Sequence, residues 1–251
     1  MVIKEKVAGP NSVWDASIVG VPLCPGCQHG VITSLIGEVI LELDIEGRAI
    51  VVNGAGCNSL PMSGFDIDRI IGPHGRGPDL ATGLKRVHPD AIVFTIQGDG
   101  DLLAIGADAL MGVLSRGEKI TIIMYNNSNY SSTGGQMAPT TLMGQVTPTC
   151  PSGRGPDAGY PVHGAEMLAQ FRTVAYSARG AVNTPANYQA TKRYLKTAFQ
   201  KQIDNIGLSY VEVISACPVQ WHLTPLQSLK RVEEIIAEYP LGEFKNVDTI
   251  E

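Results

Sequence analysis

The chain has 251 residues, 44% of them hydrophobic and 17% charged, which is enough for one large domain and argues against disorder. A net charge of −5 with scattered basic residues gives little support to nucleic-acid binding. No apolar run reaches the ~20 residues that a membrane-spanning helix requires, and the first residues lack a hydrophobic secretion segment, so we expect a cytoplasmic chain with no membrane contact.

Buried-strand patterns alternate with helical ones along the chain. In chain order we expect an irregular arm (1–22), a helix (31–43), a strand running into a glycine loop (48–57), a loop and helix (72–89), a strand (91–100), a helix (101–117), a strand (119–127), a long loop (128–164), helices (165–174 and 187–205), a strand (208–218) and a helix (224–240) capped by Thr224 and Pro225. Alternation with fully apolar strands predicts a doubly wound, mainly parallel sheet with helices on both faces. We expect one domain at 23–222, preceded by the arm and followed by a C-terminal helical extension at 223–251.

Two of the predicted strands end on polar residues. Asp99 lies between Gly98 and Gly100 at the end of one strand, and Asn127 ends the next. Because ligands of doubly wound sheets bind at the carboxyl ends of strands, we expect these side chains to meet there. The amides of the following helix attract phosphate, and the two glycines allow close backbone approach. A diphosphate would need a divalent cation, for which Asp99, Asn127 and the carbonyl of Asn129 offer oxygen ligands.

Other interpretations of this stretch exist. GDG followed by a helical pattern is also what a turn before an amphipathic helix looks like. A nucleotide-binding P-loop is the main phosphate-binding rival, but no GxxxxGK[ST] pattern occurs. The 25 residues that separate GDG from the asparagine pair fit one strand–helix–strand crossover, and this spacing resembles the thiamine-diphosphate motif.

Five cysteines in such a chain argue against a disulfide framework. Cys24 and Cys27 form a CPGC pair that can place two thiolates on one metal centre, and Cys57 and Cys217 at strand ends could complete a four-thiolate set for zinc or a 4Fe–4S cluster. Dispersed cysteines are also often small buried hydrophobes, and a redox-active dithiol is a further option for CPGC. We expect no special role for Cys150.

Taken together, the motifs resemble those of the β subunits of 2-oxoacid:ferredoxin oxidoreductases, from about residue 18 to 222. The matching segments are CPGCQHG, GAGC, PHGRGPDLATGLK, GDGDLLAIGADAL, NNSNYSSTGGQMAPTT and SACPVQW. The resemblance implies that a 2-oxo acid and coenzyme A give an acyl-CoA and CO₂, with electrons passing through a 4Fe–4S cluster to ferredoxin or a similar acceptor.

The resemblance also assigns residues. It implies that Cys24, Cys27, Cys57 and Cys217 hold the 4Fe–4S cluster, and that Asp99, Asn127 and Asn129 hold Mg²⁺. The implied thiamine-diphosphate contacts are Gly54, Ala55, Gly56, Cys57, Asn58, His74, Gly75, Gly98, Asp99, Gly100, Asp101, Asn127, Asn129, Tyr130, Ser131 and Ser132, with His74, Arg76 and Asn58 as catalytic residues. Gln28, before His29, replaces the glycine of the family pattern, which affects that turn. Ser131 and Ser132 also differ from the family pattern, which allows a polar or unusual substrate.

Thiamine-diphosphate enzymes place an activating glutamate on a separate pyrimidine-binding domain, for which this chain has no room. We therefore expect a heteromer, with a larger subunit that supplies this domain and a small ferredoxin-like subunit. 2-Oxoglutarate, branched-chain and aryl 2-oxo acids all fit the motifs equally well. The alternative function is a non-oxidative thiamine-diphosphate decarboxylase or ligase component in which the cysteines bind structural zinc.

Overall fold

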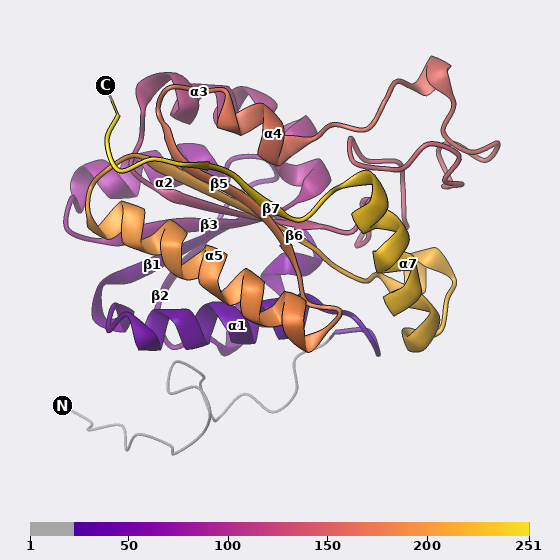
Figure 1. The fold of residues 1–251 in the computed structure, drawn as a ribbon, viewed down its shortest axis with the longest axis horizontal. Helices are drawn as coiled ribbons and strands as arrows, with labels where there is room; N and C mark the ends of the chain where they lie inside the picture. Colours follow the sequence, from indigo (N-terminus) through magenta and orange to yellow (C-terminus); the bar gives the residue numbers. More distant parts are fainter. Residues whose placement is uncertain (1–22, 251) are drawn as a thin grey trace.

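A seven-stranded sheet divides the molecule into two helical layers (Figure 1). The computed structural model describes residues 23–250, so the predicted arm at 1–22 lies outside it. The strand order is β2-β1-β3-β4-β6-β5-β7, and every neighbouring pair is parallel except β5 and β7. The strands are β1 (Ala49–Asn53), β2 (Asp68–Ile71), β3 (Ile92–Gly98), β4 (Thr121–Asn126), β5 (Val174–Ala181), β6 (Leu208–Ile214) and β7 (Gly242–Asn246). The predicted doubly wound sheet is confirmed.

Helices cover both faces of this sheet. They are α1 (His29–Glu42), α2 (Gly77–Val87), α3 (Ala107–Arg116), α4 (Gly164–Ala169), α5 (Pro185–Ile203), α6 (Pro218–Trp221) and α7 (Pro225–Glu238). Helices α1 and α5 share one apolar core with the sheet, and α2, α3 and α4 share the other. Successive side chains of β3 point to opposite faces of the sheet and so contribute to both cores. Phe94 packs on Phe199 of α5, and Val93 lies in the core on the other face.

Three strands were not predicted from the sequence. All four residues of β2 are exposed at the sheet edge, so this strand carries no buried apolar pattern. β5 is completely buried yet contains Ser177 and Arg179, whose polarity hides the strand. β7 is short, polar and antiparallel, and it pairs with β5 after α7.

The C-terminal segment begins as predicted and then departs from a purely helical extension. Thr224 caps α7 by accepting from the backbone of Gln227, whose side chain returns the bond to Thr224. After α7 the chain adds β7 to the main sheet. β7 therefore belongs to the same sheet as β1.

A buried ion pair joins β5 to β6. Arg179 and Glu212 are both fully buried, with Arg179 Nε 2.9 Å from Glu212 Oε2, and the guanidinium also contacts Glu166. The rings of Tyr239 and Phe244 lie 5.1 and 5.0 Å from the guanidinium carbon. The second Glu212 oxygen accepts from Asn126 Nδ2 at 2.6 Å, so the pair supports the end of β4.

Among residues 23–250, no helix is long and apolar enough to cross a bilayer.

Replacing Arg179 by methionine leaves the Glu212 carboxylate buried without its cation. We expect the free energy of unfolding to fall by about 3–5 kcal/mol, measured by urea denaturation near neutral pH. The matched control is Arg193→Met, because Arg193 is exposed and donates to the Gln189 carbonyl of its own helix. Equal losses in the two variants would contradict a stabilising role for the buried pair.

Candidate functional site

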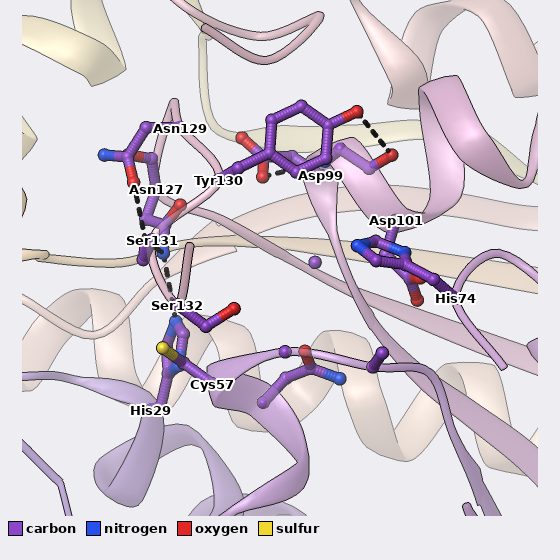
Figure 2. Close-up of a pocket in the computed structure, with 15 residues that line it drawn as sticks. His29, Cys57, His74, Asp99, Asp101, Asn127, Asn129, Tyr130, Ser131 and Ser132 are labelled. Atoms are coloured by element: carbon purple, nitrogen blue, oxygen red, sulfur yellow. Dashed lines mark hydrogen bonds and ion pairs between the residues drawn. The ribbon is translucent and has the colours of Figure 1, made fainter. Parts of the chain in front are cut away.

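A cavity of about 320 Å³ opens at the carboxyl ends of β1 and β3 (Figure 2). The strand order reverses between these two neighbouring strands. The loops that follow β1, β3 and β4 form most of its walls. The lining residues are His29, Ala55, Gly56, Cys57, Asn58, His74, Gly98, Asp99, Gly100, Asp101, Asn127, Asn129, Tyr130, Ser131 and Ser132. All of them except His29 were predicted as cofactor contacts, so the structure brings that set together.

Asp99 is a buried carboxylate at the end of β3. One oxygen accepts from the amide of Gly100 at 2.9 Å and the other from the hydroxyl of Thr140. Burial raises the pKa of Asp99 from 3.8 to about 7, and these two hydrogen bonds oppose that rise. The folded chain thus keeps the proton that an unfolded chain would lose, and stability falls as pH rises through this window. A cation beside the carboxylate would remove that cost.

The asparagines after β4 provide neutral oxygens beside this carboxylate. The Oδ1 atom of Asn127 is buried and has no hydrogen-bond partner among the described residues, while Nδ2 donates to Ser131 at 2.8 Å. An unpartnered buried amide oxygen is costly unless a cation satisfies it. Asn129 Nδ2 donates to the carbonyl of Asn127 at 3.0 Å, which fixes the loop. The donor set of Asp99, Asn127 and the backbone of Asn129 fits a hard cation such as Mg²⁺.

Asp101 organises the other side of the cavity. Its carboxylate contacts Nδ1 of His74 and accepts from the amide of Gly75 at 2.6 Å and from Gln97 Nε2 at 2.9 Å. Gly54 and Gly75 lie behind the lining; a Cβ on Gly54 would overlap an Asp101 oxygen at 1.7 Å. The Asp101 carboxylate is therefore occupied by these partners, and its contact with His74 orients the imidazole ring toward the cavity (Figure 2).

Gly98 and Gly100 of the GDG motif differ in the space available around a Cβ atom. A Cβ on Gly98 would meet nothing nearer than Asn58 Oδ1 at 3.9 Å, so this backbone is open to the cavity, as a phosphate contact would require. A Cβ on Gly100 would strike the ring of Tyr130 at 2.2 Å, and the Tyr130 hydroxyl donates to the Gly100 carbonyl at 3.1 Å. The chain then enters a π-helical segment, Asp101–Ile105, a local irregularity that often accompanies functional sites.

Of the three predicted catalytic residues, two line the cavity. Asn58 does so while its amide nitrogen donates to the Ile96 carbonyl at 2.8 Å, which ties the loop after β1 to β3. His74 is held by Asp101. Arg76 is placed differently: its guanidinium bonds both oxygens of Asp108, at 2.9 and 2.5 Å, and does not belong to the lining. Its catalytic role stays a prediction.

A second cavity, of about 430 Å³, adjoins the first and is lined by Cys24, Cys27, Cys57 and Cys217. The CPGC turn is closed by the amide of Cys27 donating to the Cys24 carbonyl at 3.0 Å. Gly26 has a φ of +80° and no room for a Cβ, which would meet Pro225 at 2.6 Å, so α7 fixes the turn. Cys150, in the long loop, lies outside this lining.

The thiols of the second cavity lie close enough to influence one another. Burial, together with the smaller effect of the charges of Cys217, Cys57 and Cys24, raises the pKa of Cys27 to about 12. Burial likewise raises the pKa values of Cys57 and Cys217. Backbone amides of His29 and Gln220 donate toward Cys27 and Cys217 and oppose these rises. Thiols that lose hydration but keep N–H donors fit sulfur atoms bound to a cationic centre.

No three His, Cys, Asp or Glu side chains within the described range converge on a point that would hold one metal ion. The four thiols surround a cavity instead. A four-thiolate set is one that either a 4Fe–4S cluster or zinc accepts.

Four residues, His29, Cys57, Asn127 and Ser131, line both cavities. His29 is buried, its Nδ1 has no partner among the described atoms, and burial lowers its pKa to about 4, so the ring is neutral near pH 7. The sequence motif CPGCQHG includes His29 but predicts no contact for it. Its adjacency to CPGC was the signal that could have indicated this position.

The long loop between β4 and α4 contacts Asp99 and the segment that follows β4. Thr140 bonds Asp99, and Thr141 donates to the Ser128 carbonyl at 2.7 Å. The buried guanidinium of Arg154 holds these threonines in place by donating to the carbonyls of Ala138, Pro139, Thr141, Gly159 and Tyr160. Neither Thr140 nor Arg154 carries a sequence signal, because each acts through contacts that only the folded loop creates.

Comparisons with known proteins agree with this geometry. Residues 54–213 match the family described as thiamine pyrophosphate enzyme, C-terminal TPP binding domain. The chain is 39% identical over 253 residues to ketoisovalerate oxidoreductase subunit VorA of Methanothermobacter thermautotrophicus, a match that covers 97% of this chain and 53% of that protein. It is 31% identical over 211 residues to 2-oxoglutarate synthase subunit KorB of Archaeoglobus fulgidus, covering 84% of this chain and 75% of that one.

A solved structure has the same fold. The 2-oxoglutarate:ferredoxin oxidoreductase from Magnetococcus marinus, with 2-oxoglutarate, coenzyme A and succinyl-CoA bound, superimposes with a TM-score of 0.78 and 23% identity over 96% of this chain and 85% of that chain. The chain spans about half the length of VorA and three quarters of KorB.

Replacing Thr140 by valine removes the hydroxyl that bonds Asp99. We expect the pKa of Asp99 to rise above about 7 and Mg²⁺ affinity to fall about 10–100-fold, measured by calorimetric titration of Mg²⁺ in the presence of thiamine diphosphate. Thr149→Val is the control, because Thr149 lies in the same loop and accepts only from the Met137 amide among the bonds described. Unchanged affinity in Thr140→Val would show that Asp99 needs no such support.

Proposed function

We propose, since the chain belongs to the family of thiamine-diphosphate-binding subunits of 2-oxoacid:ferredoxin oxidoreductases, that it carries the site at which a 2-oxo acid is oxidatively decarboxylated. A 2-oxo acid and coenzyme A give an acyl-CoA, CO₂ and a proton, and two electrons leave through a 4Fe–4S cluster to ferredoxin or another acceptor. The wall common to the two cavities, formed by His29, Cys57, Asn127 and Ser131, is the observation that carries the proposal.

The first cavity would hold thiamine diphosphate through Mg²⁺. Asp99, the free Oδ1 of Asn127 and the carbonyl of Asn129 would bind the cation, and the open backbone at Gly98 would lie along the diphosphate. Bound thiamine diphosphate would supply the electron sink for loss of CO₂. His74, oriented by Asp101, and Asn58 would face the reacting groups.

The second cavity would hold the cluster through Cys24, Cys27, Cys57 and Cys217. Because Cys57 lines both cavities, electrons would pass directly from the cofactor in the first cavity to the cluster in the second. The non-oxidative alternative would place structural zinc on the same four cysteines, so metal analysis separates the two functions.

The proposal includes partners. The matched family is a C-terminal TPP-binding domain, so the pyrimidine-binding domain with its glutamate would come from a larger subunit, and a ferredoxin-like small subunit would carry electrons outward. Because relatives of this chain are named for ketoisovalerate and 2-oxoglutarate, we propose to assay these two 2-oxo acids first.

The test is an anaerobic assay of the purified complex with coenzyme A, a panel of 2-oxo acids and a viologen dye, together with iron, sulfide and zinc analysis. We expect dye reduction coupled to acyl-CoA formation, loss of activity in Asp99→Asn with the cluster retained, and loss of iron and sulfide in Cys24→Ser. Each change removes one ligand of one cavity.

Matched controls exist in the same chain. Asp157→Asn and Cys150→Ser change an exposed carboxylate and a thiol of the long loop, neither of which lines a cavity, so both should keep metal content and activity. Zinc without iron, with CO₂ released but no acyl-CoA formed, would contradict the oxidative proposal and support the non-oxidative one.

A further inference from the structure

The hydroxyl of Ser131 lies in the wall between the two cavities and contacts groups from both. On the cofactor side it accepts from Asn127 Nδ2 at 2.8 Å and donates to Asn129 Oδ1 at 2.6 Å. On the cysteine side its oxygen lies 3.3 Å from Cys217 Sγ. The Ser131 carbonyl accepts from Gln220 Nε2 at 2.9 Å, which holds the backbone at this place.

One hydroxyl proton cannot serve both sides at once. With Cys217 as a thiol, the S–H can donate to Ser131 Oγ while the hydroxyl donates to Asn129. A cysteine bound to iron is a thiolate and has no proton to give, so the contact with Cys217 is a hydrogen bond only when Ser131 donates. The amide of Asn127 can continue to donate to Oγ in either state.

We propose that Ser131 donates a hydrogen bond to the sulfur of Cys217 and thereby raises the reduction potential of the cluster. The inference rests on the proposed function, because it requires a cluster bound by Cys217. A hydrogen bond to a cluster sulfur stabilises the more negative, reduced state and so favours electron uptake. In this role Ser131 acts on the cluster through the sulfur of Cys217.

Other donors to the sulfurs come from the backbone and persist when side chains change. The amide of Gln220 donates toward Cys217, and that of His29 toward Cys27. Ser131 is a side-chain donor that can be removed without altering the main chain. Its location beside Asn127 and Asn129 also means that the loop predicted to hold Mg²⁺ fixes the position of this donor.

The experiment is an anaerobic redox titration of the purified complex, followed by electron paramagnetic resonance of the reduced cluster. We expect Ser131→Ala to lower the midpoint potential while iron and sulfide content stay at the wild-type level. Ser131→Thr, which retains a hydroxyl, should restore a potential near that of the wild type. Thr133→Ala is the matched control, since Thr133 lies in the same turn and bonds Gln136.

Ser131→Gly is a second variant for the case in which alanine impairs cluster assembly, because it removes the hydroxyl and adds no bulk. A wild-type potential in a cluster-loaded Ser131→Ala or Ser131→Gly complex overturns the inference and leaves the proposed function intact. Absence of iron and sulfide from the wild-type complex overturns the proposed function itself. A lowered potential in Thr133→Ala as well would assign the effect to the turn and not to Ser131.

Discussion

The buried carboxylate of Asp99, directly after β3, is the group on which the arrangement of this end of the sheet depends. Asp99 is 2% exposed, and burial raises its pKa to about 7 in spite of two hydrogen bonds. Keeping such a group ionised costs several kcal/mol without a nearby cation. A buried amide oxygen beside it, on Asn127, has no partner among the described residues. One divalent cation bound between them, as we propose, would remove both costs.

The same constraint explains why so much of the chain is irregular. The long loop between β4 and α4 contributes Thr140 to Asp99 and Thr141 to Ser128, and Arg154 holds that loop through backbone carbonyls instead of a carboxylate. Behind β4, Asn126 connects the loop to the buried pair of Glu212 and Arg179. Polar groups in the core are therefore arranged in a continuous chain of partners that ends at the cofactor cavity.

The sequence predicts the strands that have an apolar pattern and the site residues that follow directly from the order of those strands. Mainly apolar runs predict β1, β3, β4 and β6, and parallel pairing then brings Asp99 and Asn127 to the same carboxyl end of the sheet. It could not predict β5, whose buried Arg179 is explained only by a glutamate 33 positions later on the neighbouring strand, nor β2, which has no buried face. Thr140, Arg154 and the two-sided position of His29 depend on tertiary contacts that have no periodic signature.

The central claim is that a magnesium-bound cofactor and an iron–sulfur cluster occupy neighbouring cavities of this chain. The most direct measurement is a crystal structure of the anaerobically purified complex, with diffraction data collected on both sides of the iron absorption edge. We expect anomalous iron density among Cys24, Cys27, Cys57 and Cys217, and density for a diphosphate and a cation beside Asp99 and Asn127. Iron density elsewhere, or a zinc signal among the four cysteines, would contradict it.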